Sequence, residues 1–114
     1  MKLVKAAIVV FGALGVAALL WMKVQARFSR DAFDVILSFA GFGVPALLGI
    51  QALAKPPMQN WQATACVAGF GVLIVHTRAW ELFGAAHDPK VACWLVALFG
   101  GAAASLYALL KPER

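Results

Sequence analysis

The sequence contains few of the side chains from which most catalytic and metal sites are built. Its 114 residues include five Asp or Glu, two His and two Cys, and charged residues make up 13% of the chain. These side chains form no catalytic triad, carboxylate pair, phosphate-binding loop or spacing typical of metal ligands. We therefore expect no enzymatic activity, no catalytic or metal-binding residues and no bound cofactor.

The two cysteines and two histidines do not change this expectation. Cys66 and Cys93 lie near opposite ends of two apolar segments, so their separation should exceed the roughly 7 Å that a disulfide can bridge. A haem held by two histidines would need a symmetric dimer or a partner's ligand, because His87 lies in a loop beside Asp88 and only His76 lies in an apolar segment. We interpret both cysteines as buried packing residues.

Charge is scarce because apolar segments fill most of the chain. Hydrophobic residues make up 63% of it, in segments at residues 3–22, 35–54, 61–77 and 91–110. Each segment is close to the roughly 20 residues with which a helix crosses a hydrocarbon core of about 30 Å. A small soluble domain needs a charged outer face on each helix, whereas these segments are apolar all round. The sequence predicts one all-α domain over residues 1–114, an integral membrane bundle of four antiparallel transmembrane helices with short loops.

Proline and capping residues indicate where the helices begin and end. Pro56 and Pro57 cannot continue a helix, and Asn60 is suited to cap the next one. Asp88 followed by Pro89 is typical of a helix start. We expect helices at about residues 3–24, 31–54, 60–83 and 89–111. Aromatic residues near these ends should lie at the level of the lipid headgroups: Trp21, Trp61, Trp80, Trp94 and Tyr107.

Small residues recur at four-residue intervals in two of the expected helices, where they would allow close packing of helix backbones in lipid. These helix-packing candidates are Gly41, Pro45 and Gly49 in the second helix, and Gly100, Ala104 and Ala108 in the fourth. Each apolar segment also carries a Phe-Gly pair near its middle, at residues 11–12, 42–43, 70–71 and 99–100. A ring beside a missing side chain could interlock neighbouring helices, so we expect a packing layer at mid-depth.

Two further features of the second helix have both a structural and a functional interpretation. The pentapeptide AGFGV occurs at residues 40–44 and again at 68–72, which we interpret as coincidence, because an offset of one helix would reverse its direction across the membrane. Pro45 should remove the hydrogen bond to Gly41. We favour a bend that fits neighbouring helices over a break that exposes carbonyls to a substrate, because no charged side chain accompanies it at mid-depth.

Both histidines and most of the acidic residues lie at the end opposite the termini. A candidate polar or ligand-binding cluster there contains Asp34, His76, Arg78 and Glu81. In a small pocket, Arg78 could hold an anion or a quinone-like headgroup, and His76 could exchange protons near neutral pH. The alternative, which we favour, is an interfacial group of ion pairs that anchors the bundle, because side chains near helix ends can reach water.

The basic side chains lie at the segment ends and do not decide the orientation. The formal net charge of +5 suits anionic lipid headgroups and requires no nucleic acid. The terminal face carries Lys2, Lys5, Lys55, Lys111 and Arg114, and the opposite face carries Lys23, Arg27, Arg30, Arg78 and Lys90. This balance prevents the positive-inside rule from choosing one topology.

Balanced charge and four helices in a chain of this size resemble the small multidrug resistance transporters, which form dual-topology dimers. Those transporters depend on a glutamate in the first helix, whereas residues 6–22 contain no ionisable side chain. A second pattern is similar to that of the DoxX-like small membrane proteins: Gly41-x-Gly43, Gly49, His76 and Gly100-Gly101. This resemblance implies a small polytopic membrane protein and no particular activity.

The function that these features favour is a non-catalytic accessory or structural subunit of a larger membrane complex, with lipid and other membrane subunits as its partners. Two alternatives remain open. One is a small-solute transporter or channel that acts as a homo-oligomer, and the other is a DoxX-like or holin-like small membrane protein. The expected location in each case is a bacterial cytoplasmic membrane.

Overall fold

The computed structural model describes residues 2–21, 32–55, 58–85 and 87–111, and these form helices joined by short connections. The elements are α1 (Lys2–Trp21), α3 (Ala32–Ala54), α4 (Asn60–Thr77), the 3-10 helix η1 (Ala79–Ala85) and α5 (Pro89–Leu110). The described residues contain no strand, so the all-helical class is confirmed. Of these helices, α1, α3 from Ile36 onward and α5 are long and apolar enough to cross a membrane.

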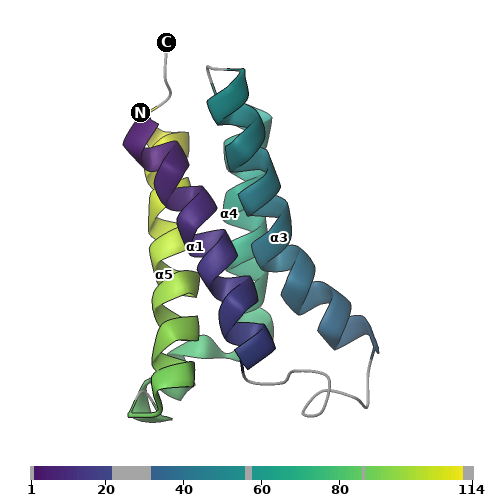
Figure 1. Ribbon diagram of the computed structural model, residues 1–114, viewed down its shortest axis with the longest axis vertical. Helices are drawn as coiled ribbons and strands as arrows, with labels where there is room; N and C mark the ends of the chain where they lie inside the picture. The colour runs from purple at the N-terminus through teal and green to yellow at the C-terminus, as the bar shows by residue number, and fades with distance from the viewer. Residues whose placement is uncertain (1, 22–31, 56–57, 86, 112–114) are drawn as a thin grey trace.

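The four long helices form a bundle in which each helix packs against two others. α1 packs against α3 and α5, and α4 packs against the same two helices from the other side. Figure 1 shows α1 and α4 running in one direction and α3 and α5 in the other. The start of α1 and the end of α5 therefore lie together, at what we call the terminal end, and η1 lies at the opposite end, the η1 end.

The third predicted helix, 60–83, is shorter than expected. α4 stops at Thr77 because Arg78 adopts a left-handed conformation, with φ 51° and ψ 53°. In this conformation the Arg78 backbone N–H donates to the carbonyls of Ile74 and Val75, and the chain leaves the helix axis after this residue. The chain then continues as η1. The expected end of the first helix at 24, and the connection that carries Lys23, Arg27 and Arg30, lie outside the described residues.

Capping interactions start the last two long helices. The Asp88 carboxylate accepts a hydrogen bond from the Lys90 N–H at 3.0 Å, and Pro89 occupies the first helical position, as expected. At the start of α4 the cap is Gln59 and not Asn60. The Gln62 side-chain oxygen accepts a hydrogen bond from the Gln59 backbone N–H at 2.8 Å. A side chain in the first turn of the helix thus gives the N–H of the cap residue a partner.

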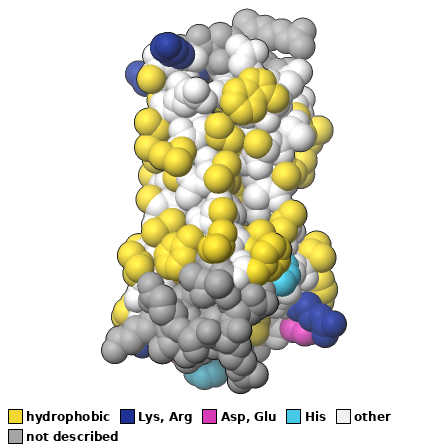
Figure 2. Space-filling view, turned by 90° about the vertical axis from the view of Figure 1, so that its right-hand side faces the viewer, with side chains coloured by type: hydrophobic (Ala, Val, Ile, Leu, Met, Phe, Trp, Pro, Cys, Tyr) yellow, Lys and Arg dark blue, Asp and Glu magenta, His cyan; other side chains and the backbone are white. Residues whose placement is uncertain are grey.

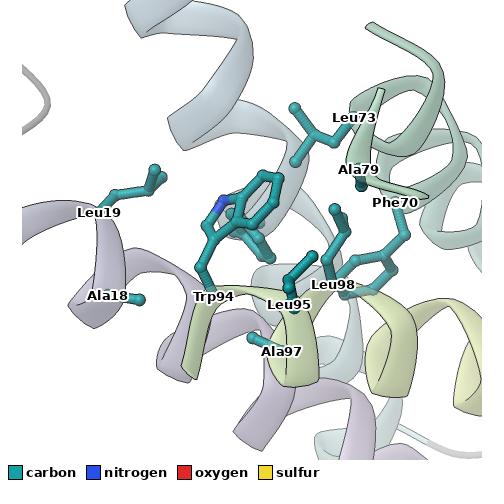
Figure 3. Packing of buried hydrophobic residues seen from close by; sticks show 10 residues of the cluster. Ala18, Leu19, Phe70, Leu73, Ala79, Trp94, Leu95, Ala97 and Leu98 are labelled. Carbon is teal, nitrogen blue, oxygen red and sulfur yellow. The ribbon is translucent and has the colours of Figure 1, made fainter. Parts of the chain in front are cut away.

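The interior contains two clusters of buried apolar side chains. The cluster at the η1 end surrounds Trp94, which lies among side chains of α1, α4 and η1 (Figure 3). Trp94 is only 6% exposed, so its position on α5 faces the core and not the lipid. The cluster at the terminal end consists of Ile8, Ala52, Met58, Ala63, Cys66 and Ala108.

Between the two ends, phenylalanine rings pack on glycines of neighbouring helices. Phe42 of α3 packs on Gly15 of α1, and Phe70 of α4 packs on Gly101 of α5. The two rings also meet edge to face, with centroids 6.0 Å apart and an interplanar angle of 74°. These two ring-on-glycine contacts therefore connect α1 with α3 and α4 with α5.

Candidate functional site

The polar residues predicted to form a cluster lie at the η1 end, but the described ones point to the surface. His76 is in the last turn of α4, Arg78 follows the helix, and Glu81 is in η1; all three are exposed. The Glu81 backbone N–H donates to the Arg78 carbonyl at 2.9 Å. No ion pair is found between the Arg78 and Glu81 side chains. The fourth member, Asp34, has its backbone in the first turn of α3, and its side chain lies outside the described part of the chain.

An open groove of about 530 Å³ reaches one of these side chains. It lies on the outer face of α4 and is lined by Ala68, Gly71, Val72, Val75 and His76. His76 is its one polar side chain, at one end of the groove. Neither Arg78 nor Glu81 lines it, so this groove brings no second polar side chain beside His76.

The helix-packing candidates of α3 and α5 lie where helices approach one another closely. On α3, Gly41 lies beneath Leu73 of α4, and a Cβ at Gly49 would lie 2.6 Å from Val9 of α1. On α5, a Cβ at Gly100 would lie 2.6 Å from the Phe11 ring. Ala104 and Ala108 belong to the packing around the cluster at the terminal end. Any larger side chain at the three glycines would displace a neighbouring residue.

Pro45 and Gly69 form a matched pair across the α3–α4 interface. A proline cannot donate to the carbonyl of the residue four positions earlier, so Pro45 leaves the Gly41 carbonyl without its helical partner. A Cβ at Gly69 would lie 3.1 Å from that oxygen and 3.2 Å from the Pro45 ring. The missing side chain of Gly69 therefore allows α4 to lie directly against the Gly41 carbonyl. This contact covers the carbonyl with α4, which agrees with the structural interpretation of Pro45.

The buried polar residues of the bundle were not recognised from the sequence. Lys5 was expected at the surface of the terminal end but is only 3% exposed. Gln62 of α4 is buried and donates to the Gln51 side chain of α3 at 3.0 Å. The Ser105 hydroxyl of α5 is fully buried and has no hydrogen-bond partner in the described structure. The spacing along the helices could have indicated this burial, because Gln62 and Ser105 each lie one helical turn from a buried apolar residue of the same helix.

The cysteines are both free, as expected. Cys66 is buried, and its Sγ lies 3.9 Å from the Pro45 carbonyl oxygen; Cys93 is partly buried. Among the described residues, no three His, Cys, Asp or Glu side chains are grouped so that they could hold a metal ion.

Comparison with known proteins adds no relative from which a function could be transferred. No protein-family model matches the sequence, and searches of curated proteins and of solved structures find no match either.

Proposed function

We propose that this chain is an integral membrane protein that spans the bilayer with four antiparallel helices and acts as a non-catalytic accessory subunit, packed against other subunits of a membrane complex. The observation that carries the proposal is the combination of an apolar exterior with an interior filled by side chains. The exterior suits lipid or other membrane helices, and the filled interior suits a packing role better than a transport role.

The exterior of the three most apolar helices is covered by large hydrophobic side chains. Exposed examples on α1, α3 and α5 are Leu3, Val10, Leu20, Ile36, Leu47, Ile50, Val96, Leu106 and Leu110. On the face shown in Figure 2, hydrophobic side chains cover the middle, whereas charged and histidine side chains lie towards the two ends. Exposed apolar surface of this extent is costly in water and favourable in lipid.

α4 is the least apolar of the long helices, yet its position is compatible with a fourth span. Its most polar side chains lie near its ends, with Asn60 and Gln62 in the first turn and His76 in the last. Thr64, at the start of the second turn, is exposed. Gln62 is turned inward to Gln51, which satisfies it without water. The residues that α4 presents outward between its ends include Ala68, Val72 and Val75, and all three are acceptable to lipid.

Two phenylalanine rings occupy the centre of the bundle. Phe42 and Phe70 are fully buried and meet in the middle. Each ring also presses on a glycine of a further helix. A transport route through a single copy would require these rings to leave their places. A scaffold that holds its helices together and offers its outer faces to partners requires no such movement.

The test is to express the full-length protein with a tag at its natural level in a bacterial host and follow two properties. The protein should stay in the membrane fraction after washing at alkaline pH, and release by that wash would contradict membrane insertion. Extraction in mild detergent followed by native mass spectrometry should then find a stoichiometric complex with larger membrane subunits. A homo-oligomer alone would contradict the accessory role and favour a transporter or channel.

Two matched variants can locate the face used by such a partner. Gly43→Leu on α3 and Gly71→Leu on α4 add bulk at positions where an added Cβ meets no atom of this chain within 4 Å. The fold should tolerate both changes. Loss of the partner with one variant and its retention with the other would assign the interface to that helix, whereas retention with both would place it on α1 or α5.

A further inference from the structure

We propose that η1 is an in-plane anchor that places Trp80 in the boundary between the headgroups and the acyl chains of the bilayer. The proposal rests on the membrane location proposed above and adds a contact with the headgroup region to the apolar outer faces of the long helices. Four properties of η1 carry it: its direction, its attachment to the bundle, its exposed side chains and its neighbours at the η1 end.

The direction of η1 follows from the left-handed turn at Arg78. That turn ends α4, and η1 then runs sideways from the end of α4 towards α5 (Figure 1). η1 packs against both of these helices. Its seven residues are far fewer than a membrane span needs. Because η1 is short and runs across the direction of the long helices, it lies along the surface of the bilayer if the long helices cross that bilayer.

One side of η1 is attached firmly to the bundle. Ala79 is fully buried and belongs to the apolar cluster at the η1 end, and Leu82 packs against that cluster. The ring of Phe83 stacks on Phe99 of α5, with centroids 5.3 Å apart and an interplanar angle of 29°. These three contacts fix the depth of η1 relative to the long helices.

The other side of η1 combines a large ring with charges. Trp80 is 52% exposed, although its ring would favour an apolar environment. Arg78 and Glu81 are exposed beside it in the sequence. An interface with a protein partner is usually depleted of charges at its centre, whereas rings that alternate with charges are typical of the lipid headgroup region.

A second aromatic residue with a cationic neighbour lies at the same end of the molecule. Trp21 ends α1 with its ring about half exposed, and the Lys90 ammonium of α5 lies 5.9 Å from the centroid of that ring. Trp21 and Trp80 are thus both partly exposed and both adjacent to basic residues. This pattern continues around the η1 end, which favours lipid over a protein partner confined to one side.

The depth of Trp80 in a bilayer tests the proposal directly. The starting protein carries Trp21→Phe and Trp61→Phe, and a derivative also carries Trp80→Phe, so the difference in fluorescence reports Trp80 while Trp94 stays in the core. Both are reconstituted in vesicles of phosphatidylcholine and phosphatidylglycerol with bromine near the glycerol end or near the methyl end of the acyl chains. We expect roughly threefold stronger quenching of Trp80 by the shallow bromines, and weak quenching by aqueous acrylamide.

Two results would overturn the anchor. Strong acrylamide quenching with no effect of bromine would place Trp80 in water or against a protein, and strongest quenching by the deep bromines would place η1 inside the hydrocarbon core. An alkaline wash of the same vesicles separates this failure from that of the membrane proposal. Protein retained after the wash with Trp80 in water refutes the anchor alone, whereas protein released by the wash refutes both.

Discussion

The two glycines within each AGFGV pentapeptide have opposite surroundings. The first glycine of each copy, Gly41 or Gly69, lies against a neighbouring helix, whereas the second, Gly43 or Gly71, has no atom within 4 Å of an added Cβ. Two positions along a helix correspond to a rotation of about 200°. If one glycine faces a neighbour, the other must therefore face outward. A glycine in an apolar helix is evidence of close packing only once the neighbours of that face are known.

The phenylalanine between the two glycines has the same use in both copies. Phe42 reaches α1 and packs on Gly15, and Phe70 reaches α5 and packs on Gly101. The two copies lie in helices that run in opposite directions. Both copies of the pentapeptide therefore pack in the same way. The first glycine and the ring face neighbouring helices, and the second glycine faces outward.

The largest expected effect comes from removing a central ring. Phe42→Ala should lower the free energy of unfolding by about 3–5 kcal/mol, because the side chain is fully buried and its loss leaves a cavity. The measurement is unfolding in mixed micelles with increasing denaturing detergent, followed by circular dichroism. Phe83→Ala, at a half-exposed ring of η1, is the control and should cost clearly less. Equal losses would show that the central ring has no special role.

A methyl group on an inward glycine should have the next largest effect. In Gly12→Ala the added Cβ would lie 2.7 Å from the Phe42 carbonyl oxygen and 2.9 Å from the Ala46 Cβ. Because these atoms belong to the α3 backbone and its first side-chain carbon, they cannot move without separating the two helices. We expect a loss of about 1–3 kcal/mol in the same unfolding assay. Gly43→Ala is the matched control, and a similar loss there would contradict the comparison.

The contact between a ring and its glycine can be measured as a coupling energy. Gly15→Ala should be costly alone, because the added methyl would overlap the Phe42 ring, and much less costly once Phe42→Ala has removed that ring. A double-mutant cycle should give a coupling of about 1–2 kcal/mol. Additive losses in the cycle would mean that Gly15 is needed for a reason other than Phe42.

The smallest effect is expected at the outward glycines, and its sign should be reversed. Gly43→Ala and Gly71→Ala add a methyl in open space and replace glycine by a better helix former. Each should therefore stabilise the protein by about 0.5–1 kcal/mol. Thermal unfolding in detergent, monitored by circular dichroism, measures the change. A clear loss at either position would show that a second molecule occupies that face in the micelle.

Much of the architecture could be predicted from local signals. The boundaries at Ala54, Pro89 and Leu110 lie within one residue of those expected, because proline, caps and the ends of apolar segments act locally. The break at Arg78 was not predictable in this way, since arginine is not a residue that favours the left-handed conformation. The extent of the candidate polar cluster could not be predicted either, because the direction of Glu81 depends on that break and the direction of His76 depends on how α4 is rotated in the bundle.

Composition and the spacing of apolar residues by themselves determined that this chain is helical, that it has apolar segments long enough to cross a membrane and that most of its charges lie near the ends of those segments. These properties depend on short-range backbone preferences and on the period of side chains along a helix. Only the tertiary structure decided which glycines lie beneath a ring, that Trp94 and Lys5 are buried, and that η1 crosses the end of the bundle. The reason is geometric. The local signals in the sequence of a helix do not state how the helix is rotated about its own axis, and this rotation decides which neighbours each of its side chains meets.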